Sequence, residues 1–361
     1  MAQTLAHPPF SSAIDPTFWA ELAELKMTKL KLDSRPHPLH ASYSSAAATA
    51  HRDDGESGAD ATAAAWMNLA GNAFAERPVI PPRAARASGR VVVVNTLEEF
   101  KGLDKKAFLE ASGAQILADI DSGAAEKDPS LLVRCDGVVF SDLKNYKHVY
   151  WFAFPALCLP EPPVLDSPPR RLAERLPSAD KRVLLHQGVQ NLRKVSGVDS
   201  TPPIFLVDLS ADSVNVRPLS ELLAVAGGGS EWWLGFVDPS PLPSNPGWPL
   251  RNALMLVHRR LKLPAVSVLC YRDVLDAPRA PDQPQSILLD VSILVPAVDA
   301  MDHGGAMPKV VGWEANGKGK MGARMVDLAP FMDPARRAVE SADLNLKLMR
   351  WRFLPDLDID R

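Results

Sequence analysis

The segment Gly312-Trp-Glu-Ala-Asn-Gly317-Lys318-Gly319 almost matches the phosphate-binding loop Gly-x4-Gly-Lys-Ser/Thr. In that loop, backbone N–H groups hold phosphates and the final hydroxyl group binds magnesium. Here Gly319 replaces the hydroxyl residue, and the residues after it lack the apolar pattern of a helix that would supply a dipole. We therefore expect a glycine-rich turn between strands at this position, and no nucleotide site.

The histidines and cysteines also fail to form a pattern with a known chemistry. His37 and His40 have no carboxylate or cysteine near them in sequence, so a solvated pair in a loop is expected rather than a metal site. No His-Glu-x-x-His or Gly-x-Ser-x-Gly motif occurs. The remaining candidates are interpreted as packed or surface histidines and as buried structural thiols, namely His148, His186, His258, Cys135, Cys158 and Cys270. The sequence thus predicts neither catalytic nor metal-binding residues.

The basic residues after Pro249 form one further cluster that could bind a ligand. A nucleic-acid surface needs more cations, with exposed aromatic residues between them. The total charge is also balanced, with 40 basic and 43 acidic residues and a formal net charge of -3. We interpret the cluster as a solvated helix face, made of Arg251, His258, Arg259, Arg260 and Lys262.

The bulk composition predicts a folded cytoplasmic protein. A chain of 361 residues with 46% hydrophobic residues can bury a large core without disulfides or metals. Three widely spaced cysteines favour a reducing compartment, and the N-terminus does not have the pattern of a secretory signal. The longest strongly apolar run, residues 149–159, is too short to cross a bilayer, so no transmembrane segment is expected.

The elements that must position any site are short, because the 33 prolines favour many loops. Alternation and apolar runs predict strands near 91–94, 138–140, 149–154, 204–209, 232–237, 266–271 and 287–295. Helical periodicity predicts helices near 15–27, 96–116, 179–195, 218–225 and 249–261. We expect an α+β, or mixed α/β, fold of mixed sheets with flanking helices, and not a doubly wound Rossmann fold.

The domain boundaries follow from composition. Residues 1–330 are expected to form one N-terminal domain with two sublobes, and the Ala/Ser-rich range 36–88 a partly disordered insertion. Residues 331–361 are expected to form a connecting helix and linker, starting with Asp333 as cap and ending before Pro355. This helix carries two adjacent apolar stripes, one formed by Ala335, Val339, Ala342, Leu346, Met349 and Phe353 and the other by Leu344, Leu348 and Trp351. Two stripes need neighbours on two sides, so the helix is expected to lead towards a further domain.

Several stretches resemble the N-terminal domain of the autophagy-related protein 7 family, the activating enzymes for the ubiquitin-like modifiers of autophagy. The similarity runs from about residue 9 to the end of the chain, with gaps in the Ala/Ser-rich and Pro-rich segments. The matching motifs are Pro9-Phe-Ser-Ser-Ala-Ile-Asp-Pro-Thr-Phe-Trp-Ala-Glu-Leu22, Asn95-Thr-Leu-Glu-Glu-Phe100, Phe140-Ser-Asp-Leu-Lys-Asn-Tyr146, Pro243-Ser-Asn-Pro-Gly-Trp-Pro-Leu-Arg-Asn252, Val311-Gly-Trp-Glu314 and Asp343-Leu-Asn-Leu-Lys-Leu-Met-Arg-Trp-Arg352.

This resemblance implies a role in recruitment and not in catalysis. In the family, adenylation with ATP and magnesium, thioester formation, zinc binding, modifier binding and homodimerisation belong to a C-terminal domain. The chain is therefore expected to dock autophagy conjugating enzymes near the thioester, to be inactive and monomeric alone, and to act in the cytoplasm at the autophagosome assembly site. It is expected to need no cofactor and no nucleic acid.

The resemblance also suggests which residues contact partners. The family-like stretches place partner-binding candidates at Phe10, Asp142, Lys144, Tyr146, Trp248 and Arg251. Activating enzymes of this superfamily often use an arginine just before the adenylation domain to reach nucleotide phosphates, which makes Arg350 and Arg352 candidates in a full-length enzyme. The competing interpretation is a stand-alone enzyme or scaffold whose site is assembled from residues distant in sequence.

Overall fold

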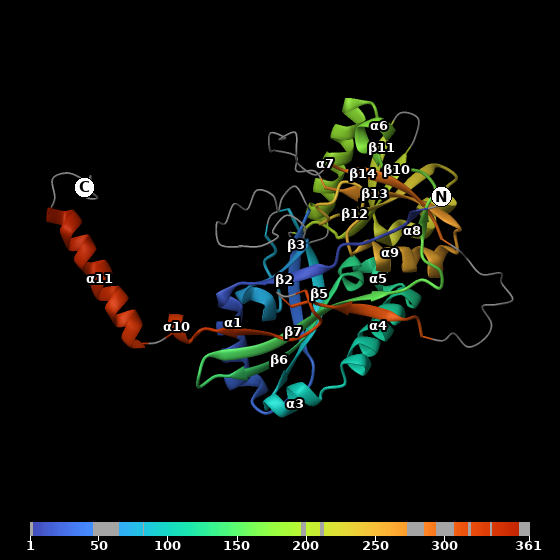
Figure 1. Ribbon diagram of the computed structural model, residues 1–361. Helices are drawn as coiled ribbons and strands as arrows, with labels where there is room; N and C mark the ends of the chain where they lie inside the picture. The colour runs from blue at the N-terminus through green and yellow to red at the C-terminus, as the bar shows by residue number, and fades with distance from the viewer. Residues whose placement is uncertain are drawn as a thin grey trace.

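The computed structural model describes residues 3–45, 65–81, 83–195, 200–209, 213–272, 285–293, 307–316, 319–332 and 334–353. Within these ranges the chain builds two eight-stranded sheets, sheet A and sheet B, with helices packed on their faces (Figure 1). Both sheets contain parallel and antiparallel pairs, which confirms the predicted mixed α+β class.

Sheet B has the strand order β15-β7-β6-β5-β3-β4-β2, and β16 also pairs with β7. Strand β7 is an interior strand and not an edge strand, because it pairs with β6 and also with β15 and β16. Its continuous apolar sequence is typical of such a position. The strands of sheet B are β2 (Phe10–Ile14), β3 (His37–Ser44), β4 (Ala65–Leu69), β5 (Ala84–Val94), β6 (Arg134–Asp142), β7 (Lys147–Leu157), β15 (Val310–Trp313) and β16 (Arg324–Asp327).

The two ends of sheet B are joined by a buried carboxylate. Glu314, directly after β15, accepts hydrogen bonds from the Ser12 backbone N–H at 2.6 Å and from the Ser12 hydroxyl at 2.9 Å. The Arg324 guanidinium lies 2.9 Å from the same carboxylate. Strands β2 and β15 stand at opposite ends of the strand order, so this contact means that the sheet curls back on itself.

Each face of sheet B is covered by different helices. Val91 and Val93 of β5 pack in one hydrophobic cluster with α1, whereas Val92 and Val94 pack in another with α3 and α4. This alternation is the period of two that a strand imposes on its side chains. The covering helices are α1 (Pro16–Leu25), which continues as the π-helical turn η1 (Lys26–Leu30), α3 (Leu97–Gly102) and α4 (Lys105–Asp121).

Sheet A has the order β1-β8-β14-β13-β12-β10-β11, and β9 also pairs with β14. Its strands are β1 (Gln3–Thr4), β8 (Val164–Leu165), β9 (Arg170–Arg171), β10 (Ile204–Leu209), β11 (Val214–Pro218), β12 (Glu231–Val237), β13 (Ala265–Tyr271) and β14 (Ile287–Ser292). The chain therefore enters sheet A, builds most of sheet B, completes sheet A and returns to sheet B with β15 and β16.

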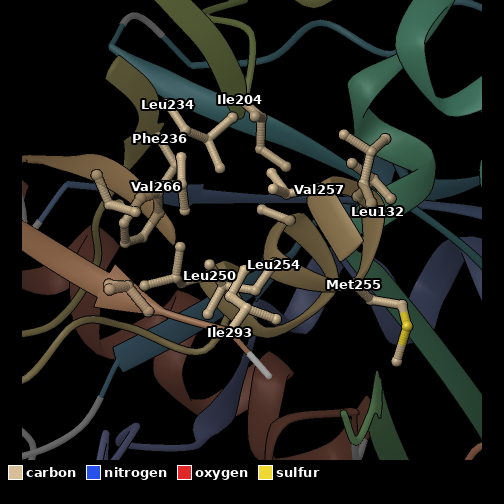
Figure 2. Close-up of a cluster of buried hydrophobic side chains, with 14 of the residues drawn as sticks. Leu132, Ile204, Leu234, Phe236, Leu250, Leu254, Met255, Val257, Val266 and Ile293 are labelled. Atoms are coloured by element: carbon tan, nitrogen blue, oxygen red, sulfur yellow. The ribbon is translucent and has the colours of Figure 1, made fainter. Parts of the chain in front are cut away.

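Helix α9 (Leu250–Leu256), extended by the π-helical turn η5 (Val257–Leu261), joins the two parts of the fold. Its side chains Leu250, Leu254 and Val257 pack in one cluster with residues of sheet A, and with Leu132, which precedes β6 of sheet B (Figure 2). Six of the seven α9 residues are buried. A helix that is apolar on nearly all sides is expected in the centre of a domain, so the two sheets share one core at this point.

The remaining helices include two whose limits follow the sequence pattern closely. Helix α7 spans Ala179–Val195, as predicted, and α11 spans Pro334–Phe353, ending before Pro355. The predicted cap at Asp333 lies outside the described residues. The shorter elements are α5 (Ala124–Lys127), α6 (Leu172–Arg175), α8 (Leu222–Gly227), α10 (Ala329–Met332) and the 3-10 turns η2 (Gly71–Phe74), η3 (Pro129–Leu132) and η4 (Leu219–Glu221).

The prediction of an insertion over 36–88 is wrong for the described part of that range. Strands β3, β4 and the first half of β5 lie there, and β3 and β5 are interior strands of sheet B. Their small side chains are buried in the sheet, including Ala41, Ala65, Ala85 and Ala87. Alanine-rich composition therefore reflects close packing here. Residues 46–64 lie outside the described residues.

Candidate partner-binding site

Two of the predicted partner-binding residues, Trp248 and Arg251, lie against each other at the start of α9. The guanidinium carbon of Arg251 is 4.8 Å from the centre of the Trp248 ring, which is a cation–π contact. The Trp248 indole N–H donates to the Phe154 carbonyl of β7 at 2.7 Å. The ring is therefore fixed to sheet B, and the arginine is stacked on its face.

The loop that leads into α9 is held by a buried ion pair. Arg272, with a fully buried side chain, places its Nε 2.8 Å from Asp238. Its other nitrogens donate to the backbone carbonyls of Leu242 and Asn245. Asp238 in turn accepts the Gly247 backbone N–H at 2.9 Å. Burial raises the pKa of Asp238, although the Arg272 charge opposes that shift.

Asn252 connects the first turn of α9 to the end of β7. Its side-chain oxygen accepts the Leu157 backbone N–H at 2.9 Å. Its amide nitrogen donates to the carbonyls of Leu132 at 2.8 Å and Pro155 at 3.0 Å. Three backbone groups that cannot reach water are thereby paired with one side chain, and the position of Arg251 relative to β7 follows from these bonds.

A cavity of about 160 Å³ lies between this helix start and the N-terminal segment. Arg251 Nη2 donates to the thiol sulfur of Cys158 at 3.3 Å. The ring of His7 contributes a further polar group, and its Nδ1 lies 3.3 Å from the Gly247 carbonyl, to which it must donate. Burial, together with the nearby Arg251 charge, lowers the pKa of His7 to about 4. The apolar lining residues are Leu5, Leu157, Leu159, Pro162, Pro163 and Leu254. We call this site the Arg251 pocket.

The other predicted contact residues occupy the hairpin turn between β6 and β7. Asp142 accepts hydrogen bonds from the backbone N–H and the side-chain amide of Asn145, and these bonds lower its pKa. Lys144 is exposed, and Tyr146 is 40% exposed with a positive φ of 54°. The turn is therefore an exposed polar surface. It is not part of the lining of the Arg251 pocket.

The structure corrects the expectation for Phe10. Its side chain is only 2% exposed, and its ring packs against Tyr43 at 5.3 Å and Phe154 at 5.4 Å. Phe10 is thus a core residue of sheet B, where it cannot contact a partner. Arg350 and Arg352 both lie in the last turn of α11, where they are exposed.

Three further predictions differ from the structure wholly or in part, because sequence spacing did not show the tertiary contacts. The solvated helix face is confirmed for Arg259 and Lys262, which are exposed, and is wrong for His258, which is buried. Arg259 lies 2.8 Å from Asp121 at the end of α4, and the half-buried Arg260 lies 2.6 Å from Glu126 on α5. Cys135 and Cys270 are fully buried, as expected, but Cys158 is half-buried beside Arg251. His37 and His40 lie in β3 and not in a loop.

The glycine-rich segment near residue 312 does not form a phosphate-binding loop in its described part. Val310–Trp313 is strand β15, with a register shift at Gly312, and β16 follows. Gly317, Gly319 and Gly322 also have the spacing Gly-x-Gly-x-x-Gly of a dinucleotide-binding loop. That motif requires a helix after the loop, whereas a strand follows here. Residues 317 and 318 lie outside the described residues.

Comparison with known proteins gives the family. The model of the N-terminus of the ubiquitin-like modifier-activating enzyme ATG7 matches residues 5–332. The chain is 38% identical over 360 residues to ATG7 of Rattus norvegicus, covering 99% of this chain and 49% of the rat protein. ATG7 of Homo sapiens is also 38% identical, with 48% of its length covered. The chain therefore belongs to the ATG7 family, and it spans about half the length of the curated relatives it matches.

The fold agrees with this assignment. The crystal structure of the Kluyveromyces marxianus Atg7NTD–Atg10 complex matches with a TM-score of 0.61 at 20% identity, covering 91% of this chain and 99% of that chain. The K. marxianus Atg7NTD solved alone gives a TM-score of 0.60. At this identity the likeness shows a shared fold.

Two features are absent from the part of the chain that the structure describes. None of the helices there has the length and apolar character needed to cross a membrane. In the same part of the chain, no three or more His, Cys, Asp or Glu side chains are grouped so that they could hold a metal ion.

Proposed function

We propose that this chain is the recruitment domain of an ATG7-type activating enzyme and that it docks an autophagy conjugating enzyme. The observation that carries the proposal is the 38% identity to ATG7 over 99% of the chain. It is supported by the K. marxianus domain of the same fold, which was solved with Atg10, a conjugating enzyme. We further propose that the protein works in the cytoplasm at the site of autophagosome assembly.

Two measurements on the purified 361-residue chain test this function. The chain is expected to bind a conjugating enzyme of the same organism, measured by isothermal titration calorimetry. It is expected to give no modifier-dependent ATP–pyrophosphate exchange, because we assign adenylation, with its ATP, magnesium and zinc, to the other half of the ATG7 length. Robust exchange by this chain would favour the competing interpretation of a stand-alone enzyme.

The hairpin turn between β6 and β7 is one proposed contact surface. Lys144→Ala and Tyr146→Ala are expected to weaken binding with little change in thermal stability, because both side chains are exposed. The matched control is Val149→Ala, since Val149 lies in the same hairpin but packs against the core. Val149→Ala is expected to lower thermal stability more than Lys144→Ala or Tyr146→Ala does. If Lys144→Ala and Tyr146→Ala bind the conjugating enzyme as tightly as the unmodified chain does, the turn is not part of the interface.

Helix α11 is proposed to join this domain to the rest of an ATG7-length protein. Six large apolar side chains of this helix are between 48% and 60% exposed, namely Val339, Leu344, Leu346, Leu348, Met349 and Trp351. If the helix packs on a second domain, its amide hydrogens should exchange more slowly in the full-length enzyme than in this chain.

Arg352→Ala in the full-length enzyme tests the proposed nucleotide contact. That contact is wrong if the variant binds nucleotide with unchanged affinity. Homodimerisation and modifier binding are likewise assigned to the full-length protein.

A further inference from the structure

We infer that the Arg251 pocket receives one acidic side chain of the docked protein partner, flanked there by an aliphatic residue. The inference rests on the proposed function, because the partner meant is the conjugating enzyme. It adds the chemistry of the contact and its place: the carboxylate binds the Arg251 guanidinium, and the aliphatic neighbour lies against the leucines and prolines of the pocket wall.

The first argument is the incomplete pairing of Arg251. A guanidinium offers several N–H donors, but among the described residues its acceptor is the thiol sulfur of Cys158, at 3.3 Å. Sulfur is a weak acceptor. No carboxylate in the described ranges lies within 4.0 Å of Arg251, whereas Arg259 and Arg260 on the same helix each have one. Arg251 is therefore held in place by Trp248 with most of its donor capacity left for another molecule.

The second argument is the charge of the pocket at neutral pH. His7 is neutral there, because its pKa is lowered to about 4. Arg251 is then the single positive charge among the described residues that line the pocket. One charge matches a monoanionic carboxylate better than a dianionic phosphate. Because the walls are apolar, the ion pair is weakly screened and strengthened relative to one in water.

The third argument concerns the type of partner. The cavity holds about 160 Å³, which suits a side chain and not a larger cofactor. Arg251, which lines this recess, is stacked on Trp248, and arginine and tryptophan are among the residue types most enriched in interface hot spots. Both features favour an inserted side chain of a protein.

The test measures the affinity of the 361-residue chain for its conjugating enzyme by calorimetry, with three variants. Arg251→Gln removes the charge and is expected to weaken binding about 30-fold, as a hot-spot loss. Arg251→Lys keeps the charge but loses the planar fork, so an intermediate loss of about 5-fold is expected. Lys262→Gln is the matched control, because it removes an exposed charge from the residue that ends the same helix, and should stay within about 2-fold.

A second measurement locates the contact in the unmodified protein. Cys158 is the half-buried cysteine of the three in the chain, and Cys135 and Cys270 are fully buried, so a thiol reagent such as dithionitrobenzoate should label Cys158 first. Saturating conjugating enzyme is expected to slow this labelling at least about 10-fold, with Cys158→Ser giving the background. Hexanoate serves as a small carboxylate without a protein attached, and it should protect the thiol only weakly.

The outcomes separate the two claims. If the unmodified chain binds no conjugating enzyme, the proposed function fails and this inference fails with it. If the chain binds but Arg251→Gln binds equally well, or the thiol stays unprotected in the complex, only the inference is overturned. Strong protection by hexanoate together with no protection by the enzyme would also overturn it, since the pocket would then bind a small acid.

Discussion

Arg272 and Arg251 lie near each other in the fold, since Arg272 holds the loop that leads into α9 and Arg251 is in the first turn of α9. Their surroundings are very different. Arg272 is fully buried, is paired with Asp238 and donates to two backbone carbonyls. Arg251 is half-buried at the edge of a cavity and contacts an indole ring and a thiol. A completely satisfied arginine holds a loop in one conformation, whereas an incompletely satisfied one can gain a partner. The difference suggests that the first is structural and that the second is available for binding.

The substitution Arg272→Met is the strongest test of the claim that Arg272 is structural. The variant leaves the Asp238 carboxylate buried without its charge partner and leaves two loop carbonyls without a donor. A loss of about 3–5 kcal/mol in the free energy of unfolding is expected, measured by urea denaturation. Adding Asp238→Leu should recover part of that loss, because the unpaired charge is then removed. A double variant as unstable as the single one would contradict this account.

Asn252, the residue after Arg251, should behave like Arg272. Asn252→Ala removes the partners of the Leu157 N–H and of the Leu132 and Pro155 carbonyls in a buried place. We expect a loss of about 2–4 kcal/mol in unfolding free energy. Asn145→Ala is the control, since Asn145 makes its hydrogen bonds in an exposed turn. A similar small loss for both variants would mean that α9 is held by packing alone.

His148 extends the comparison to pH. Its ring is 3% exposed and stacks on Trp19 at 4.7 Å, and burial lowers its pKa from 6.5 to about 4. The unfolded chain therefore binds a proton at a higher pH than the folded protein does. The stability contributed by the neutral ring is complete above pH 6.5 and is lost as the pH falls towards 4, by up to about 3 kcal/mol.

Urea denaturation at pH 7 and pH 4 measures this effect. His148→Gln should lose less stability between the two values than the unmodified protein. His7 is titrated in the same range, because its pKa is also about 4, so His7→Gln is measured alongside. An unchanged pH dependence in His148→Gln would show that the ring does not carry the effect.

Much of this fold follows from the sequence, but the site does not. Helix α7 and strand β10 have their predicted limits, because α7 has the apolar period of a helix and β10 is a short run of apolar residues. Strand β3 gave no such signal, because histidine, proline, alanine and serine fill most of its positions, and β4 has only five residues. Their place in sheet B is decided by neighbouring strands and not by local preference.

The Arg251 pocket shows why binding residues are harder to predict than helices. The pocket is lined by His7, Cys158 and Arg251, and Trp248 stacks on Arg251 beside it. These residues come from three distant segments, which only the topology brings together. The sequence motif around Trp248 identified two of them. The prediction of Cys158 as a buried thiol is wrong, because nothing in the local sequence reveals that the chain leaves β7 beside an arginine.

The smallest expected change in stability, that of Arg251→Met, tests whether Arg251 and Arg272 have different roles. Arg251→Met removes the cation–π contact with Trp248 and the weak bond to Cys158 while keeping an apolar chain of similar length. Its unfolding free energy should fall by only about 0.5–1 kcal/mol, several times less than for Arg272→Met, in the same urea titration. A loss as large as that of Arg272→Met would show that Arg251 is a second structural arginine. A small loss would leave its guanidinium free for a partner, because the fold would then not depend on it.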